Sequence, residues 1–406
     1  MIIQGGYTLK VKKINAERMG YSNKLMVFNL IRYSPGISRN EITKITGLDK
    51  STVTKITYEL ISKKLIREGD RKLSQGPGRK PIRLEAVDKA AASIVVKVGV
   101  EKTVLGLGYL NNFIEKVSAF DTPKNFSSFV SKVALEVNKI YKDKNGTNIV
   151  GISFSFPGMI DRKNLIIEYV PHFNWSNVDL KKAFLKELPY WEKPIFAANE
   201  AKLALQAELY FNKEIKNLNN GVYVFISQGI GGALLIDGQI YLGPNYTAGE
   251  FGHMTIHEDG EKCFCNNRGC WETFASIDTI SKIYEYSNGK LEGQNYEEKF
   301  KNLIDKAQKR ENNAYEIVDR MLYYLAIGSV NLINTLNPEF VILGGYGYLF
   351  PDSYFTQVAN LIKERALKPT LKTFKKVTKP YFDIETACLM GANLRVMDEF
   401  SEKALV

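Results

Sequence analysis

Three of the four cysteines in this chain lie within eight residues of one another. Cys263, Cys265 and Cys270 have the spacing C-x-C-x4-C, and His253 precedes the first of them by ten residues. Three thiolates and one imidazole form the ligand set of a closed, tetrahedral zinc site of the structural kind. The spacing therefore predicts one structural Zn²⁺ per chain. The alternative, two buried free thiols and a disulfide, suits a secreted protein better than this chain.

Two glutamates border this cluster. Glu250 precedes His253 by three residues, and Glu272 follows Cys270 by two. A metal at the cluster would hold both carboxylates near each other, and paired carboxylates suit the hydroxyl groups of a small polar ligand. We therefore interpret the cluster as a brace for a small-molecule pocket.

The bulk composition is that of a globular protein with more than one domain. The chain has 406 residues, of which 45% are hydrophobic and 24% charged, and chains of this length usually form two or three domains. The first residues lack a signal-peptide pattern, and no apolar run reaches membrane-spanning length. Four cysteines in this length point to a reducing compartment. We expect a cytoplasmic protein with no membrane contact.

The positive charge is concentrated near the N-terminus. The net charge of the chain is +11. Residues 1–85 contain 18 Lys and Arg against 7 Asp and Glu, so this segment carries the whole excess. A basic segment joined to a neutral body indicates a nucleic-acid-binding module. We expect residues 1–85 to form a DNA-binding domain with a basic linker, and residues 86–406 to form the body.

The basic segment has the pattern of a helix-turn-helix. Apolar residues over 25–31 fit the buried face of a first helix. A capping box at 38–41 starts a second helix, with Ile42 and Ile45 expected to face inward. A third helix is expected over roughly 50–63. This spacing predicts that the third helix reads the major groove of double-stranded DNA.

The exposed side of the third helix, with the start of the second, supplies the predicted DNA contacts. Short hydroxyls can reach bases or phosphates, and cations neutralise the backbone. These residues are Arg39, Lys50, Ser51, Thr52, Thr54, Lys55 and Tyr58.

A wing is predicted to follow the three helices. Segments 65–68 and 82–85 alternate like two short strands, and a glycine- and proline-rich stretch, 74–81, lies between them. Such a stretch is slim and extended, so Arg79 and Lys80 are predicted to reach DNA, with Arg79 in a narrow minor groove. A plain flexible linker is the alternative.

The neutral body has a repeated pattern of strands and helices. A helix is expected over 126–141, and hairpin turns are expected at Asn111-Asn112 and Asp237-Gly238. Two hairpin-plus-helix halves predict a duplicated α/β architecture with a cleft between two lobes. The expected strands cover 93–100, 104–110, 149–155, 222–226, 233–236 and 239–241.

The body resembles the ROK family (repressors, open reading frames and sugar kinases), which has the actin-like ATPase fold. The most specific stretch is Ala248-Gly249-Glu250-Phe251-Gly252-His253, which continues into the cysteine cluster and Trp271-Glu272. The other matching stretches are 155–158, 199–201, 229–232, 337–338 and 343–345. With a winged helix-turn-helix before it, the chain is similar to the repressor branch of the family, in particular to repressors of xylose operons.

The resemblance implies a sugar site in the cleft. The residues that it places there are Asn199, Glu200, Glu250, His253 and Glu272. It also implies a double role for His253, because one ring nitrogen can bind metal while the other donates to a sugar hydroxyl. No basic cluster occurs among these residues, which favours a small neutral sugar over a phosphosugar.

The nucleotide-binding segments depart from the kinase pattern. The first phosphate loop of the family resembles D-x-G-G-T, but here Lys97 replaces the aspartate and Val100 the second glycine. A β-branched side chain at that position would block close approach of the backbone to a phosphate. In the second loop, Ser227-Gln228 replaces a leading Gly-Thr. The residue that matches the catalytic aspartate is Glu200, whose extra methylene would misplace a base by about 1 Å and cost roughly a hundredfold in rate.

The sequence therefore predicts a sugar-responsive transcriptional repressor that is not an enzyme. It would be a homodimer, with two modules on the half-sites of a palindromic operator. A sugar between the lobes would shift the population between two states of different operator affinity. Two alternatives stay open: an ATP-dependent sugar kinase with a fused DNA-binding domain, and a repressor controlled by a protein partner.

Overall fold

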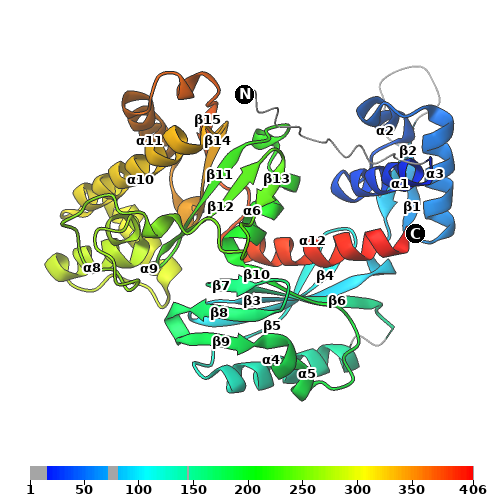
Figure 1. The fold of residues 1–406 in the computed structure, drawn as a ribbon, viewed down its shortest axis with the longest axis horizontal. Coiled ribbons are helices and arrows are strands. Elements are labelled where there is room, and N and C mark those ends of the chain that lie inside the picture. Colours follow the sequence, from blue (N-terminus) through cyan, green and yellow to red (C-terminus); the bar gives the residue numbers. More distant parts are fainter. Residues whose placement is uncertain (1–15, 72–80, 144–145, 406) are drawn as a thin grey trace, which may run out of the picture. The chain divides into compact units, whose positions relative to one another are not determined.

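The computed structural model describes residues 16–71, 81–143 and 146–405 (Figure 1). These residues form two compact units. The first contains the described residues up to Ala91, the short segment Leu110–Phe113 and the residues from Met397 on; the second contains the rest. Because the first unit takes in two later segments, the division at residues 85 and 86 stays a prediction about domain organisation. None of the described helices is long and apolar enough to cross a membrane.

The first unit contains three helices followed by a two-stranded antiparallel hairpin, in the order expected for a winged helix-turn-helix. The expected capping box is present: the Ser38 hydroxyl accepts from the Glu41 backbone N–H, and the Glu41 carboxylate accepts from the Ser38 N–H. Gly47 ends the second helix in the left-handed conformation that glycine adopts without strain. The elements are α1 (Ala16–Tyr33), α2 (Arg39–Thr46), α3 (Lys50–Ser62), β1 (Ile66–Arg71) and β2 (Ile82–Ala86).

The core of the first unit is formed by apolar side chains from all five of these elements. The last turn of α2 does not contribute to it. Phe28 of α1, Val53 of α3 and Leu84 of β2 are fully buried, and Ile37 pairs with Leu84 as a short extension of the hairpin. The expectation that Ile45 faces inward is wrong, because its side chain is 61% exposed. Helix α2 ends at Thr46, so Ile45 lies in its last turn, and Ile42 alone makes the buried contact of this helix.

The second unit contains the duplicated α/β architecture that the sequence predicted. Its two five-stranded sheets have the same strand order when both are read from the strand that comes last in sequence: β10-β6-β3-β4-β5 and β15-β14-β11-β12-β13. In each sheet the first three strands in sequence pair antiparallel and the last two pair parallel (Figure 1). Each sheet is the centre of one lobe.

The strands agree closely with the expected segments. The hairpin turns fall where they were expected, since Asn112 and Asp237 both have positive φ angles. The first sheet contains β3 (Ala92–Val98), β4 (Lys102–Tyr109), β5 (Ile114–Asp121), β6 (Ile149–Phe156) and β10 (Ile195–Asn199); the second contains β11 (Gly221–Ile226), β12 (Ile230–Ile236), β13 (Gln239–Tyr241), β14 (Phe340–Gly345) and β15 (Lys376–Thr378); a third, small sheet contains β7 (Met159–Asp161), β8 (Ile166–Val170) and β9 (Trp175–Asp179).

Helices cover the two large sheets. Helices α4 and α5 lie on one side of the first sheet (Figure 1) and bury Phe129 and Phe184, while α10 buries a long apolar stripe in the second lobe. The helices are α4 (Phe126–Asp143), α5 (Leu180–Glu187), α6 (Glu200–Phe211), α7 (Glu272–Ala275), α8 (Ile277–Asn288), α9 (Tyr296–Gln308), α10 (Ala314–Leu336), α11 (Asp352–Arg365) and α12 (Ile384–Ala404).

Helix α6 is the element that carries site residues from the first lobe. It begins directly after β10, with Asn199 as its N-cap and Glu200 as its first residue. Helix α12 packs tightly against it: a Cβ atom on Gly391 would lie 2.0 Å from the carbonyl oxygen of Leu203. Because no side chain fits there, the two helices are held at a short separation, and the start of α6 is held with them.

Candidate functional site

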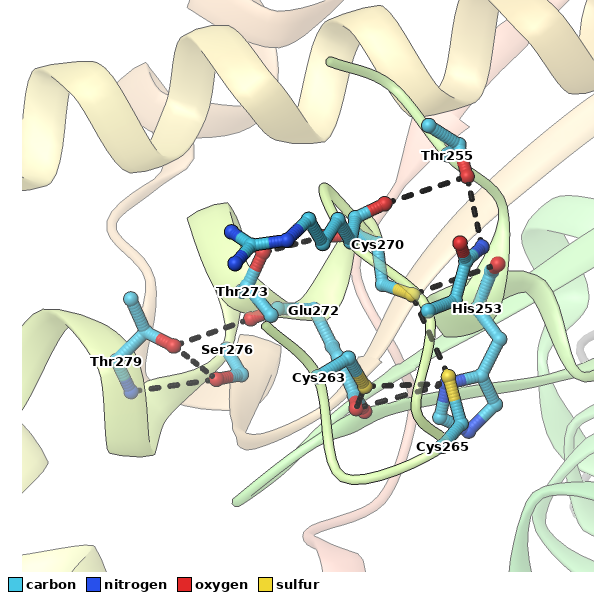
Figure 2. Close-up of polar contacts among 11 residues, drawn as sticks. His253, Thr255, Cys263, Cys265, Cys270, Glu272, Thr273, Ser276 and Thr279 are labelled. Carbon is cyan, nitrogen blue, oxygen red and sulfur yellow. Dashed lines mark hydrogen bonds and ion pairs between the residues drawn. The ribbon is translucent and has the colours of Figure 1, made fainter. Parts of the chain in front are cut away.

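His253 and the three clustered cysteines lie together in the second lobe. Their ligand atoms are all within 4.8 Å of one another. The Sγ atom of Cys263 lies 3.6 Å from Nδ1 of His253, and the Sγ atoms of Cys265 and Cys270 are also 3.6 Å apart (Figure 2). In a tetrahedral site with Zn–S bonds of about 2.3 Å, neighbouring sulfurs lie about 3.8 Å apart. The four residues therefore fit a zinc ion.

The backbone around the cysteines is folded to bring the ligands together. Asn266 adopts a left-handed conformation with φ of 71°, which asparagine tolerates better than most residues. At Gly269 a Cβ atom would lie 1.6 Å from the carbonyl oxygen of His257, so no other residue fits. His253 ends a short 3-10 helix, Phe251–His253, whose Gly252 is equally crowded against Ile230. Glycines thus allow the close chain crossings that the cluster needs.

The three thiols differ in acidity: burial opposes ionisation of Cys265, but hydrogen bonds from the Asn267 backbone and the neighbouring thiols lower its pKa. Burial and the Glu272 carboxylate raise the pKa of Cys263 well above that of an ordinary thiol, and burial raises the pKa of Cys270 to about 11. Without a cation these last two thiols stay protonated at neutral pH. A bound cation is the charge that would stabilise their thiolate forms.

Glu272 joins this cluster to the neighbouring cavity. One carboxylate oxygen lies 2.9 Å from the Sγ atom of Cys263 and 3.6 Å from Nδ1 of His253 (Figure 2). The other oxygen lies so close to Gly229 that a Cβ there would be 2.7 Å away. The residue before it, Trp271, is fully buried and donates a hydrogen bond to the Tyr324 carbonyl of α10. Glu272 is thereby held between the cysteine cluster and the cleft.

All five residues expected to bind a sugar line one cavity, which we call the inner cavity. It has a volume of about 100 Å³. Because the Nδ1 atom of His253 is turned toward the thiols, its Nε2 atom is the nitrogen left for a ligand. The lining residues that were expected are Asn199, Glu200, Glu250, His253 and Glu272. The structure therefore brings these residues together; that they bind sugar stays a prediction.

The two residues from the first lobe are positioned differently. The Asn199 side chain is used within the protein, since its oxygen accepts from the Ala201 N–H and its NH₂ group donates to the Gly158 carbonyl. Glu200 makes no such cap, and burial raises its pKa to about 7 against the opposing effect of the Lys97 cation. At neutral pH this carboxyl group can therefore both donate and accept hydrogen bonds.

A buried lysine beside Glu250 was not expected from the sequence. The Lys202 side chain is 4% exposed, and its Nζ atom lies 3.6 Å from the Glu250 carboxylate. Burial lowers the pKa of Lys202, while Glu250 opposes that shift. A single buried lysine thus lies beside Glu250, while no lysine or arginine among the described residues lines the inner cavity itself. No local pattern marks Lys202, because its role depends on the approach of α6 to a residue 48 positions away in sequence.

A second cavity adjoins the inner one on the side of the first phosphate loop. This lysine-side cavity has a volume of about 450 Å³ and shares Glu200, Ser227 and Gln228 with the inner cavity. Lys97 and Val100 both line it, as do four glutamates: Glu101, Glu200, Glu297 and Glu385. Three lysines balance part of this charge, but Lys116 is paired with Glu385. The cavity is lined by acids where a nucleotide's phosphates would need donors.

The exposed face of α3 carries most of the predicted DNA contacts. Lys50, Lys55 and Tyr58 are exposed, and positions 50, 54 and 58 follow one another at four-residue spacing along one face of the helix. The hydroxyl groups are partly used within the helix. Ser51 and Thr52 donate to Asp49, which lowers the pKa of that carboxyl, and Thr54 donates to the Lys50 carbonyl.

Arg39 differs from the other predicted DNA contacts, because its guanidinium group bonds to other elements of the same unit. Its Nε atom donates to the Thr57 hydroxyl at 2.8 Å, and its guanidinium pairs with Glu68 of β1 at 2.7 Å. The same group lies over the Tyr58 ring. These bonds join α2 to α3 and the wing, so Arg39 has a structural role in this unit. Arg79 and Lys80 lie outside the described residues, and their DNA contacts remain predictions.

Residues 93–398 match the sequence pattern of the ROK family, and the chain therefore belongs to that family. The Xylose repressor of Bacillus spizizenii is 33% identical over 336 residues, which cover 82% of each chain. The DNA-binding transcriptional dual regulator NagC of Escherichia coli is 26% identical over 342 residues, again 82% of each chain.

Solved structures agree with this assignment at the level of the fold. A ROK family transcriptional regulator, a homologue of the Escherichia coli MLC protein, matches with a TM-score of 0.74 over 95% of this chain and 98% of that chain, at 22% identity. A ROK glucokinase from Streptomyces griseus, solved with glucose and AMPPNP, matches with a TM-score of 0.60 over 75% of this chain and 98% of that chain, at 19% identity. The body thus has the two-lobed fold that family regulators and sugar kinases share.

Proposed function

We propose that the protein is a sugar-responsive repressor, which binds operator DNA through its first unit and a small neutral sugar in its inner cavity. The observation that carries this proposal is the convergence of three carboxyl groups, an amide and an imidazole on that cavity. Groups of this kind satisfy several hydroxyls at once. The Xylose repressor and the transcriptional dual regulator NagC, which match over most of the chain, support a function of this kind.

The acidic lining of the lysine-side cavity supports a regulator over a kinase. Phosphoryl transfer needs cations and backbone N–H groups around the phosphates. Here Lys97 is next to Glu200, so its charge offsets a carboxylate of the protein itself. Glu101, Glu297 and Glu385 would repel a triphosphate. We infer that the body has kept sugar recognition without ATP chemistry.

Zinc is the metal that we propose for the His253–cysteine cluster, as a structural ion. Three sulfurs and one nitrogen at near-tetrahedral spacing favour Zn²⁺ over oxygen-seeking cations. The ion would hold the loop that carries His253 against the segment that carries Glu272. The sugar-facing nitrogen of the imidazole would then have a fixed direction.

On the DNA side, the proposal assigns base and phosphate contacts to the exposed face of α3, with Lys50 and Lys55 as its cations. Arg79 would add a minor-groove contact and Lys80 a further DNA contact. As a homodimer in the cytoplasm, the protein would place two such modules on the two half-sites of an operator. A sugar that binds one state of the body more tightly would change operator affinity through linkage.

The decisive experiment measures operator binding with and without sugars. The operator is first selected from random double-stranded DNA by the full-length protein, and binding is then followed by fluorescence anisotropy. We expect at least one neutral sugar to change operator affinity tenfold or more, while ATP turnover with the same sugar stays at background. ATP-dependent phosphorylation of a sugar would establish the kinase alternative instead. Operator binding that no sugar changes would favour control by a protein partner.

A further inference from the structure

We propose that the effector is a glycoside of at least two sugar units, of which the second lies in an outer cavity against the rings of Phe264 and Tyr286. This inference rests on the proposed function and names the class of sugar that the site takes. The outer cavity has a volume of about 520 Å³ and is lined by both aromatic residues.

The inner and outer cavities are continuous. They share His172, Gln228, Gly229, Phe264 and Glu272 as lining residues. The inner cavity, at about 100 Å³, is small beside its neighbour. A substituent on a ring bound among the carboxylates would therefore have the outer cavity beside it.

Phe264 is an exposed aromatic side chain within the cysteine cluster. It lies between Cys263 and Cys265, both proposed ligands, and 53% of it is exposed. Its ring packs edge-on against His253, with 5.0 Å between the ring centroids. Burial of an exposed aromatic ring by a ligand is favourable, and a side chain that is already ordered loses little conformational entropy on binding. The aliphatic C–H face of a sugar ring is a suitable partner.

Helix α8 supplies the opposite wall of the outer cavity. Tyr286 is 94% exposed and Ile283 is 46% exposed, and both line the outer cavity. A ligand in this cavity would cover them. Polar groups line the same wall, among them the ion pair between Lys282 and Asp278. Apolar faces interspersed with hydrogen-bonding groups match a sugar, whose ring has C–H faces and a hydroxyl edge.

The charge of the outer cavity favours a neutral ligand. Its acidic lining residues are Glu261, Glu272 and Asp278, and its lysines are Lys262 and Lys282. The charges nearly cancel, so neither a phosphate nor a cation is preferred. A phosphosugar would have to extend toward the lysine-side cavity instead, where Glu101, Glu297 and Glu385 oppose an anion. The lining of the two cavities therefore favours extension outward by a neutral unit.

The outer cavity is also bounded by the first lobe. His172 lies in the short 3-10 helix Pro171–Phe173 after β8, while Phe264 and α8 belong to the second lobe. A second sugar unit would contact both lobes. It would therefore favour the closed form of the cleft more than a single ring can, which is the differential affinity that a population shift requires.

Calorimetric titration of the full-length protein tests this inference. The probes are D-xylose, D-glucose, xylobiose, cellobiose and glucose 6-phosphate. We expect a disaccharide to bind about tenfold or more tightly than its own monosaccharide. Tyr286→Ala should remove most of that advantage and leave monosaccharide binding unchanged. The exposed Tyr241, which lines none of the three cavities, provides the matched control, and Tyr241→Ala should behave as wild type.

Three other outcomes would contradict the outer subsite, the direction in which the ligand extends, or the proposed sugar response. If monosaccharides bind as tightly as disaccharides, or if Tyr286→Ala keeps the disaccharide advantage, the outer subsite is refuted while the proposed sugar response stands. If glucose 6-phosphate binds most tightly and Lys97→Met abolishes that preference, the ligand extends into the lysine-side cavity and the inference is wrong. If no sugar binds and operator binding is intact, both the inference and the proposed sugar response fail.

Discussion

At the scale of single residues, the cysteine cluster makes the sharpest prediction. We expect one zinc ion per chain in protein purified without added metal, and substoichiometric zinc in Cys265→Ser, because three ligands no longer close the site. Cys388→Ala is the matched control. That thiol is fully buried beside α6, far in sequence from the cluster, and its loss should leave the zinc content at one. Elemental analysis measures both. Full zinc occupancy in Cys263→Ser/Cys265→Ser would place the metal elsewhere.

Glu200 predicts a pH dependence of stability. Its pKa is about 7 in the folded protein against 4.5 for an ordinary glutamate, because the site is buried. Between these values the folded state binds more protons than the unfolded state, so the free energy of unfolding falls as pH rises from about 5 to 7. The loss from this residue is at most about 3 kcal/mol. Glu208, whose pKa is also about 7, contributes in the same direction.

Urea unfolding at pH 5, 6, 7 and 8 in the presence of zinc measures this effect. Glu200→Gln should flatten the dependence, and Glu208→Gln should leave the Glu200 part in place. The Lys97 cation lowers the pKa of Glu200, so Lys97→Met should move the loss of stability to higher pH. An unchanged slope in Glu200→Gln would show that this carboxyl group is ionised in the folded protein.

At the scale of elements, α3 and its neighbours separate DNA contact from structural support. Lys55 is exposed, with no hydrogen bond or ion pair in the described part of the chain. Lys55→Ala should weaken operator binding similarly for all sequences and reduce the salt dependence by about one unit, at unchanged thermal stability. Arg39 instead bonds to Thr57 and Glu68, so Arg39→Ala should lower the thermal stability of the first unit as well. Equal stability of the two variants would contradict the structural role of Arg39.

The end of α12 supplies a second test at this scale, because its last residues belong to the first unit. The Arg32 side chain of α1 is fully buried, and its Nη1 atom bonds to Asp398 and Ser401 of α12 at 3.3 and 3.0 Å. Asp398→Ala removes the carboxylate that pairs with this buried guanidinium and should lower the free energy of unfolding by about 2 kcal/mol. Lys403→Ala, which removes an exposed ion pair on the same helix, should cost less than about 0.5 kcal/mol. Similar losses in both variants would show that Arg32 does not depend on Asp398.

At the scale of the whole molecule, the proposed function assigns sugar response and operator binding to different units. Glu250→Ala should abolish the sugar response and leave operator affinity in the absence of sugar unchanged. A lost charge-assisted hydrogen bond costs about 1.5–3 kcal/mol, or roughly ten- to a hundredfold in sugar affinity. Glu168→Ala, at an exposed site on β8 outside the three cavities, is the control. Operator complexes titrated with the inducing sugar decide the question, and wild-type sensitivity of Glu250→Ala would place the sugar elsewhere.

Local features of this protein could be predicted from the sequence, because they depend on neighbouring residues. The capping box at Ser38 and Glu41 and the hairpin turns at Asn112 and Asp237 all formed as expected. The cluster of His253 and three cysteines belongs to the same class, since its four residues occur within 18 residues and short chain closures are favoured. The strand segments were found for the same reason, from apolar runs and turn residues along the chain.

Only the tertiary structure decided how distant segments meet. Lys97 and Glu200 are more than a hundred residues apart, yet they line one cavity and the Lys97 cation lowers the pKa of Glu200. Lys202 pairs with Glu250, and Arg39 bonds within its own unit, although nothing in their local sequence marks either role. The outer cavity also has no sequence pattern, because its lining comes from the cysteine loop, helix α8 and His172 of the first lobe. Local sequence determines backbone geometry, but the partners of a side chain depend on packing between elements, and that packing is set by the whole core.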